Sequence, residues 1–351
     1  MAIVFSPGPG SGTVSPSSNL TDAGGRAATK WTLGSTGGQA AVTASGGGFV
    51  AQFLGAANFK YMAVSAGAKH SCGLDEGGVA YCWGYNGDGQ LGIGVAPLGS
   101  GPVFAYPQPT ASIGDLTFSQ LAGGAYHTCG LTLSGVGHCW GVNVDGRLGT
   151  GNFTPVNAPT QVLVNRAFAG MSAGQAHSCA LDLSNHAACW GRNVDAQLGF
   201  GYTAVPPQRI APDSVAINVP VLILSGQLFS QIASGGVHNC ALELFTAAAW
   251  CWGNQVNGQL GNGVSGAAGA LPSVGTVPVA GGMAFSAITA GDLHTCAIDL
   301  AGAAWCWGSD ASGQLGDNPA ALPGPIQNVP VPVSGGKTFK AISAGRSHTC
   351  A

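Results

Sequence analysis

The side chains in this chain that could do chemistry are histidines and cysteines, and they recur in one pattern. A histidine stands two residues before a cysteine, and a second cysteine follows ten residues later, as in His294, Cys296 and Cys306. The same pattern starts at His70, His127, His177 and His238, and its opening returns at His348. Imidazole and thiolate groups can bind zinc, a histidine can act as a general base, and two thiols can form a disulfide.

The spacing of the two cysteines favours a disulfide over a metal site. Short apolar runs on both sides of a Gly, Ser or Ala-rich centre predict a strand, a turn and a second strand, which place the cysteines opposite each other. Zinc sites usually have four ligands and closer cysteine pairs, so a metal site is less favoured, as are free buried thiols. The predicted disulfides join Cys72 to Cys82, Cys129 to Cys139, Cys179 to Cys189, Cys240 to Cys251 and Cys296 to Cys306. The extra residue between Cys240 and Cys251 predicts a bulge or a longer turn in that copy.

The repeated histidine is interpreted as structural. A residue that recurs six times at one place in a repeat is expected to orient a turn by hydrogen bonding and not to catalyse a reaction. Asp88, Asp145 and Asp195 lie in turns of the Asn-x-x-Gly-Gln-Leu-Gly type, and each turn has too few carboxylates for the six to eight oxygens that calcium prefers. We therefore expect turn hydrogen bonding by these aspartates, and no metal or cofactor.

The composition predicts an all-β protein. The 351 residues include 59 glycines, only 7% are charged, and no segment has a convincing apolar period of 3.6. A net charge of −3 without a basic cluster argues against nucleic-acid binding, and no apolar run is long enough to span a membrane. Eleven cysteines, ten of them in local pairs, indicate an oxidising compartment, so we expect an extracellular or cell-surface location.

Residues 1–57 lack the repeat and resemble a bacterial immunoglobulin-like domain of the invasin/intimin type. The resemblance covers the later strands of such a domain, and it implies that the chain is a fragment of a longer bacterial surface protein. The alternative is a Gly/Ser-rich linker with incidental strands. The residues that carry the resemblance are Gly12 to Pro16, Thr21 to Ala27, Trp31 to Gly34 and Gly37 to Gln39.

Residues 58–351 resemble the regulator-of-chromosome-condensation repeat family. The shared motif reads Ser-Ala-Gly-x-x-His-Thr-Cys-Ala-Leu and then Cys-Trp-Gly-x-Asn-x-x-Gly-Gln-Leu-Gly, and it occurs five times in full with the beginning of a sixth copy. The resemblance implies a β-propeller, usually seven-bladed, with four strands in each blade. The count of copies predicts a ring that is incomplete at the C-terminus, so that Cys350 has no partner.

Two further residues of the repeat have predicted structural roles. A glycine shortly before each histidine is expected to allow a turn or a close approach of inner strands. A tryptophan follows the second cysteine, so it points to the opposite face and is expected to pack between blades. The glycines are Gly67, Gly123, Gly174, Gly235, Gly291 and Gly345, and the tryptophans are Trp83, Trp140, Trp190, Trp252 and Trp307.

The sequence predicts binding and not catalysis. It has no phosphate-binding loop, no Gly-x-Ser-x-Gly motif and no His-Glu-x-x-His motif. Function is expected in the variable connectors between repeats. Exposed aromatics beside Arg and Pro in these connectors suit contact with a protein or a glycan. The chain itself is expected to be a monomeric fragment. The alternatives are a structural spacer and a guanine-nucleotide exchange factor for a small GTPase, the latter disfavoured by the predicted disulfides. The candidate binding residues are Phe104, Tyr106, Tyr202, Arg209 and Asp213.

Overall fold

The computed structural model describes residues 2–7, 13–20, 30–32, 38–46, 49–57, 60–95, 105–164, 166–200, 216–265, 272–317 and 325–351. These residues form 28 β-strands and no helix, which confirms the predicted all-β class. Within the same residues, no helix is long and apolar enough to cross a membrane. Contacts divide the chain into a first unit, Met1–Met62, and a second unit, Ala63–Ala351, with a boundary five residues later than the expected one.

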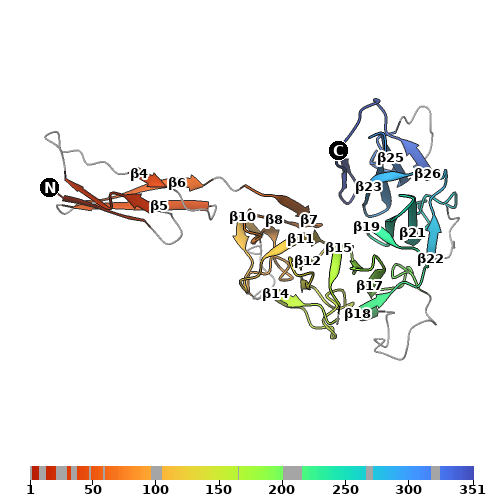
Figure 1. Ribbon diagram of the computed structural model, residues 1–351, viewed down its shortest axis with the longest axis horizontal. Helices are drawn as coiled ribbons and strands as arrows, with labels where there is room; N and C mark the ends of the chain where they lie inside the picture. Colours follow the sequence, from red (N-terminus) through yellow and green to blue (C-terminus); the bar gives the residue numbers. More distant parts are fainter. Residues whose placement is uncertain are drawn as a thin grey trace. The chain divides into compact units, whose positions relative to one another are not determined.

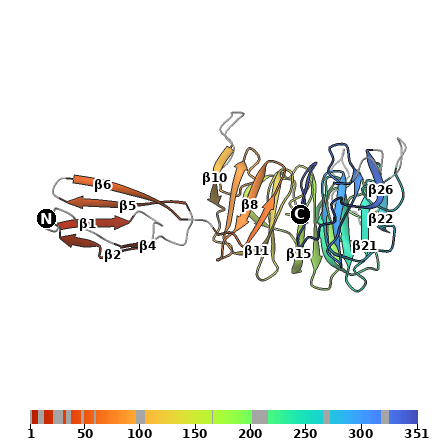
Figure 2. The ribbon, with the colours of Figure 1, turned by 90° about the horizontal axis from the view of Figure 1, so that it is seen from above.

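The first unit contains two antiparallel sheets. One has the strand order β3-β1-β5-β6, and β2 pairs with β4 in the other (Figure 2). Phe5 and Val42 are its buried apolar residues among those described. The strands are β1 (Ala2–Pro7), β2 (Thr13–Ser15), β3 (Ser18–Leu20), β4 (Lys30–Thr32), β5 (Gly38–Gly46) and β6 (Phe49–Ala57).

The described part of the second unit contains five four-stranded antiparallel sheets that follow one another around a common axis (Figure 1). Each sheet is a blade, and its first strand lies next to the axis. Blade 1 contains β7 (Ala63–Ala66), β8 (His70–Leu74), β9 (Ala80–Tyr85) and β10 (Ala105–Ala111). Blade 2 contains β11 (Phe118–Gly123), β12 (His127–Thr132), β13 (Gly137–Gly141) and β14 (Val156–Gln161).

The remaining blades repeat this plan. Blade 3 contains β15 (Phe168–Ala173), β16 (His177–Asp182), β17 (Ala187–Arg192) and β18 (Ala216–Leu222). Blade 4 contains β19 (Phe229–Ser234), β20 (His238–Glu243), β21 (Ala249–Gly253) and β22 (Ser273–Pro278). Blade 5 contains β23 (Phe285–Ala290), β24 (His294–Asp299), β25 (Ala304–Ser309) and β26 (Ile326–Pro332). A sixth repeat contributes β27 (Ser343–Ala344) and β28 (Thr349–Cys350).

The hairpin between the second and third strands of each blade has the predicted register. Cys296 lies opposite Cys306, and the last pair before the turn is Ile298 with Ala304. Gly302 has a φ of 89°, the left-handed conformation that a three-residue hairpin loop requires. In blade 4 the extra residue lies in the turn, because Leu242 pairs with Ala249 and Cys240 still faces Cys251.

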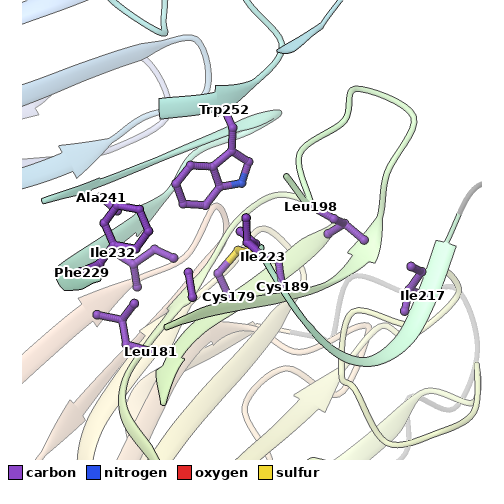
Figure 3. Close-up of a cluster of buried hydrophobic side chains, with 11 residues drawn as sticks. Cys179, Leu181, Cys189, Leu198, Ile217, Ile223, Phe229, Ile232, Ala241 and Trp252 are labelled. Atoms are coloured by element: carbon purple, nitrogen blue, oxygen red, sulfur yellow. A yellow bond between two sulfur atoms is a disulfide. The ribbon is translucent and has the colours of Figure 1, made fainter. Parts of the chain in front are cut away.

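All five cysteine pairs form disulfides within the hairpins, at a Cα–Cα distance of 4.1 Å in each. Their sulfurs are buried, whereas Cys350 is free and exposed. Each disulfide packs against the next blade. In Figure 3, Cys179 and Cys189 of blade 3 lie beside Phe229, Ile232 and Trp252 of blade 4.

Four of the five repeated tryptophans occupy the predicted place between blades, whereas Trp83 of blade 1 is only partly buried. Trp140, Trp190, Trp252 and Trp307 are fully buried, and each lies about 6 Å from a phenylalanine at the start of its own blade's inner strand. An aromatic side chain buries 150–250 Å² of surface, so these pairs supply much of the apolar contact that holds successive blades together.

The glycine of the Gly-x-x-His turn is required by close approach. A Cβ atom on Gly67 would lie 2.3 Å from His70 Cε1 and 2.3 Å from the carbonyl oxygen of Gly124 in the next blade. Gly124, Gly174, Gly235 and Gly291 are equally crowded by the histidine of their own turn. The predicted role of these glycines is therefore confirmed, and the histidine ring is one of the groups that they accommodate.

Candidate binding face

Each repeated histidine bridges to the next blade. Its Nε2 atom contacts a polar side chain at the position that follows the next repeat's histidine, whereas we expected it to orient its own turn. The pairs are His70 with Thr128 at 2.7 Å, His127 with Ser178 at 2.9 Å, His177 with Asn239 at 2.9 Å, His238 with Thr295 at 2.8 Å and His294 with Thr349 at 2.9 Å.

The hydrogen-bond partners define which nitrogen carries the proton. The Thr128 hydroxyl donates to the Gln90 carbonyl at 2.8 Å, so its oxygen accepts from His70 and Nε2 carries the hydrogen. The same carbonyl accepts from the Trp140 indole at 2.9 Å. In the next three interfaces the corresponding carbonyls are those of Arg147, Gln197 and Gln259, each with one donor from the residue after the histidine and one from the tryptophan.

Burial keeps these histidines neutral. Burial lowers the pKa of His70, His177 and His294 to about 4 and that of His238 to about 3, and it holds the pKa of His127 well below its usual value. Within the described residues, the buried Nδ1 atoms of these five histidines have no hydrogen-bond partner. Protonation would bury a second N–H without an acceptor, so the rings serve as fixed hydrogen-bond donors and are poor general acids at neutral pH.

A series of backbone hydrogen bonds links successive Gly-x-x-His turns around the axis. We call this end of the second unit the channel face. The residue after each glycine donates its N–H across to the next turn. The donor and acceptor pairs are Ala68 and Gly124, Ala125 and Gly174, Gln175 and Gly235, Gly236 and Gly291, and Asp292 and Arg346, at 3.1–3.3 Å.

The turns and inner strands enclose a cavity of about 410 Å³ on the axis. Glycine, alanine and serine form most of its wall, and the larger polar side chains are Gln175, Asp292, Arg346 and His348. Arg346 Nε donates to the Asp292 carboxylate at 2.9 Å. The wall is therefore mostly small side chains and backbone, without a cluster of three or more metal-binding side chains among the described residues.

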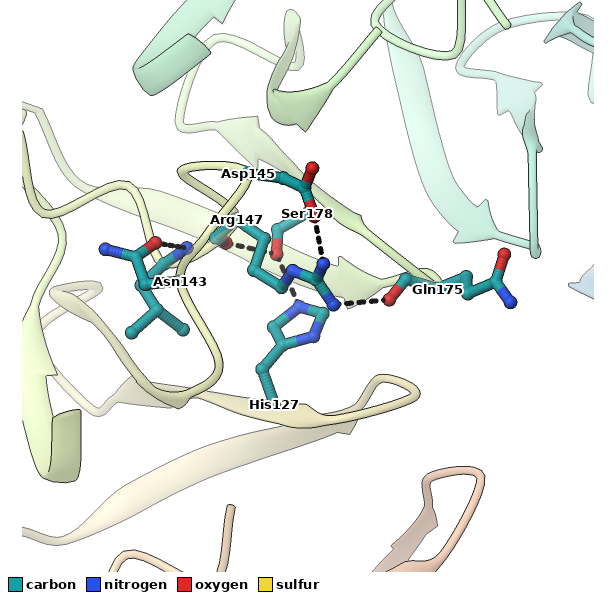
Figure 4. Close-up of polar contacts among 7 residues, drawn as sticks. His127, Asn143, Asp145, Arg147, Gln175 and Ser178 are labelled. Carbon is teal, nitrogen blue, oxygen red and sulfur yellow. Dashed lines mark hydrogen bonds and ion pairs between the residues drawn. The ribbon is translucent and has the colours of Figure 1, made fainter. Parts of the chain in front are cut away.

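Blade 2 departs from the repeat at Arg147, where the other turns have glutamine. In those turns the glutamine Oε1 accepts a backbone N–H, as Gln90 does from Asp88 at 3.0 Å and Gln197 does from Asp195 at 2.9 Å. A guanidinium cannot accept, and Arg147 instead pairs with the Asp145 carboxylate and donates to the Gln175 carbonyl at 2.9 Å (Figure 4). Only 5% of Arg147 is exposed, and burial lowers its pKa.

A lysine lies between two tyrosines where blades 1 and 2 meet on this face. Lys69 Nζ is 5.3 Å from the centroid of the Tyr85 ring and 5.5 Å from that of Tyr126. Both distances allow a cation–π attraction. Lys69 is exposed and the two tyrosines are partly buried, so the group combines an accessible positive charge with ordered aromatic surface.

Sequence reasoning did not single out Lys69, Tyr85 and Tyr126. Aligning the repeats with one another reveals them, because they occupy positions whose residue type changes from blade to blade. The position before the histidine holds Lys69, Tyr126, Ala176, Val237, Leu293 and Ser347. Variable side chains beside an invariant repeat residue are the signal that marks this face.

The structure describes only one of the five predicted binding residues. Tyr106 lies in β10, opposite Gly84, and packs partly against the apolar cluster around the Cys72–Cys82 disulfide. It is therefore less exposed than expected. Phe104, Tyr202, Arg209 and Asp213 lie outside the described residues.

Four-stranded blades around one axis, with successive blades locked by histidine and tryptophan, define a β-propeller of the RCC1 type. The family model described as the regulator of chromosome condensation (RCC1) repeat matches residues 77–131, 135–181 and 301–351. A second model with the same description matches residues 63–90 and 285–314. Together these matches cover just over half of the sequence, and the chain belongs to the RCC1 repeat family.

Known proteins share this similarity over part of their length. The ultraviolet-B receptor UVR8 of Arabidopsis thaliana is 30% identical over 303 residues, which cover 83% of this chain and 50% of UVR8. Human HERC6, a probable E3 ubiquitin-protein ligase, is 28% identical over 267 residues, covering 73% of this chain and 19% of HERC6. The crystal structure of human WBSCR16 aligns with a TM-score of 0.69 at 21% identity, over 83% of this chain and 71% of that one. The chain thus spans half or less of these two curated relatives.

Proposed function

We propose that this chain is a non-catalytic binding module of a secreted or cell-surface protein, and that a protein partner contacts the inter-blade loops of its channel face. One observation carries the proposal. The repeated histidines form hydrogen bonds between blades, as His127 does with Ser178, whereas the residues that vary between repeats lie on the accessible loops.

The variable residues suit recognition of a protein. Arg and Tyr are enriched at the centres of protein interfaces, and an ordered aromatic loses little entropy on binding. Lys69, Tyr85 and Tyr126 form one such group. The hydrogen bonds between successive turns beneath them support a preorganised surface, which lowers the cost of association.

The disulfides support the proposed compartment. Five buried disulfides in 351 residues persist in an oxidising environment and are rare in the cytosol. The same argument disfavours an exchange factor for a cytosolic GTPase. The ligase and receptor functions in the names of HERC6 and UVR8 are not extended to this chain, which covers only part of either protein.

We further propose that the first unit is part of a bacterial immunoglobulin-like domain, which would make the chain a piece of a bacterial surface protein. Its two antiparallel sheets are compatible with such a sandwich. Strand β2 (Thr13–Ser15) lies within the motif segment Gly12 to Pro16, and β4 (Lys30–Thr32) overlaps the segment Trp31 to Gly34. Thr21 to Ala27 of the motif lie outside the described residues.

Site-specific photo-crosslinking on the channel face tests the proposed function. A photoreactive phenylalanine analogue at Tyr85 or Tyr126, in protein exported by the producing cells, is expected to capture one defined protein partner. The same analogue at Val329, an exposed residue in the middle of outer strand β26, is the matched control and should capture none. Equal labelling from all three positions, or none from the tyrosines, would count against a channel-face partner.

A further inference from the structure

The turns between the second and third strands carry exposed apolar side chains in four successive blades. These turns lie at the opposite end of the strands from the channel face, and we call that end the hairpin-tip face. The exposed residues are Leu133 at 81%, Leu183 at 70%, Phe245 at 79% and Leu300 at 70%. Apolar side chains repeated in this way on one face are a typical sign of an interaction surface.

The turns do not need these apolar residues in order to fold. In blade 3 the Asp182 carboxylate accepts the N–H groups of Ser184 and His186 at 2.8 and 3.0 Å. In blade 5 Asp299 caps its turn in the same way, at 2.9 Å for each of two N–H groups.

Blade 1 forms the same turn with a charged residue at the apolar position. Asp75 accepts from Gly77 and Val79 at 2.9 and 2.8 Å, although Glu76 stands where the other blades have leucine. Blade 1 is therefore a natural control, because its turn keeps both capping bonds without an apolar tip. The exposed leucines contribute to neither the cap nor the core, so they are free to contact a partner.

A carboxylate accompanies the apolar residue in three of these turns. Glu243 accepts from the backbone N–H of Phe245 and Thr246 at 3.2 and 2.6 Å. Hydrogen bonds from the Thr246 hydroxyl and from the backbone N–H groups lower the pKa of Glu243, and bonds from the Trp305 indole and its own turn lower the pKa of Asp299. The donors to Glu243 and Asp299 are neutral groups, so these hydrogen bonds do not cancel the negative charges of the two carboxylates. The Asp182 carboxylate, in contrast, forms ion pairs with Arg166 at 3.4 Å and with His186, when protonated, at 3.5 Å.

We propose that the hairpin-tip face of blades 2 to 5 is a docking surface for a cationic amphipathic segment of a partner protein. Aliphatic side chains of the segment cover Leu133, Leu183, Phe245 and Leu300, and its lysines or arginines pair with Glu243 and Asp299. A protein segment fits better than a membrane because the carboxylates repel anionic lipid headgroups. This surface is separate from the channel face and does not depend on the partner proposed there.

The test uses the full chain and a fluorescein-labelled peptide of 14 residues that alternates lysine and leucine. Its binding, followed by fluorescence anisotropy, is expected to be at least tenfold tighter than that of the matched glutamate–leucine peptide and to weaken with salt. The variant Leu133→Ser/Leu183→Ser/Phe245→Ser/Leu300→Ser should bind at least tenfold more weakly. The variant Val144→Ser/Val194→Ser, altered at exposed apolar residues of the channel-face loops, should bind like the original chain.

A second variant separates the charge from the apolar contact without disturbing the turns. Glu243→Gln/Asp299→Asn retains an oxygen acceptor for the capping bonds of each turn, loses the bond from the Trp305 indole to Asp299 and removes both charges. It should therefore weaken binding of the lysine–leucine peptide several-fold and reduce the salt dependence. Equal affinity for the two peptides, or unchanged affinity in both tip variants, would overturn the proposal. The proposal would also be overturned if the original chain did not bind the peptide but adsorbed to phosphatidylglycerol vesicles, and if the fourfold serine variant abolished that adsorption.

Discussion

The side-chain amide of Gln120 forms two hydrogen bonds with the backbone of Met171 in the neighbouring blade. Its Oε1 accepts the Met171 N–H at 3.0 Å, and its Nε2 donates to the Met171 carbonyl at 3.0 Å. Gln231 makes the same pair of bonds with Ile288 at 3.2 Å each, between blades 4 and 5. Inner strands of adjacent blades, which share no sheet, are thereby joined through a side chain that substitutes for a strand partner.

The other interfaces use a hydroxyl in place of the glutamine. Where Gln120 would stand, the odd-numbered blades have Ala63, Gly170 and Ala287, and a Ser or Thr two residues later supplies an acceptor instead. That residue accepts a backbone N–H from the next blade, in the pairs Ser65 with Gly123, Ser172 with Ser234, and Thr289 with Ala344, at 2.8–3.0 Å. A glutamine amide and a Ser or Thr hydroxyl thus alternate along the described repeats as the group that bonds the inner strand of the next blade.

Replacing Gln120 with alanine should destabilise the second unit by about 1–3 kcal/mol, because it leaves the N–H and carbonyl of Met171 without partners at a blade interface. Urea unfolding followed by tryptophan fluorescence measures the change. Gln161→Ala removes an exposed glutamine and should change the free energy of unfolding by less than about 0.5 kcal/mol. Equal effects of the two substitutions would show that the bonds to Met171 contribute nothing.

The repeated spacing of residues within each copy allowed the hairpins and the blade architecture to be predicted from the sequence. The features that the sequence did not predict depend on contacts between residues in different blades. The ten-residue spacing of the cysteines and the short strand-like runs between them identify the hairpins. Side chains alternate along a strand, so the residue after Cys139 points away from the disulfide, and this places Trp140 between blades. The bond of His70 to Thr128 joins residues 58 apart and depends on how blades stack. Nothing in the spacing of one repeat specifies that partner.

The buried histidines should make the protein less stable in mild acid. An unfolded histidine has a pKa of about 6.5, whereas the folded values are about 4 for His70, His177 and His294 and about 3 for His238. Between these values the unfolded chain binds more protons, so stability is full above pH 6.5 and falls as the pH drops towards 4. Each histidine contributes at most about 1.4 kcal/mol per pH unit.

The pH dependence can be assigned to single residues. His238→Gln should reduce the slope of unfolding free energy against pH by up to about 1.4 kcal/mol per unit, measured by urea unfolding between pH 7 and 4.5. Gln161→Ala, which changes no ionisable group, should keep the original slope. A slope of zero in the original chain over this range would mean that the histidines are protonated without cost.

Arg147 tests how far the repeat tolerates a buried charge. Arg147→Gln restores the residue of the other turns, whose Oε1 can accept the Asp145 N–H, and it should leave the chain as stable or raise its stability by about 1 kcal/mol. Arg147→Leu supplies no acceptor and removes the cation beside Asp145, so it should cost about 1–3 kcal/mol. Thermal unfolding of both variants decides, and a glutamine variant as unstable as the leucine one would contradict this account.

The disulfides predict the pattern of thiol reactivity in protein from an oxidising compartment. Intact mass after alkylation under denaturing conditions should show one modified cysteine without prior reduction, Cys350, and eleven after reduction. Replacing Cys240 and Cys251 with serine should lower the free energy of unfolding by about 2–3 kcal/mol, because the short loop is no longer closed in the unfolded chain. Eleven freely reactive thiols before reduction would remove the main support for an exported module and reopen a cytosolic role.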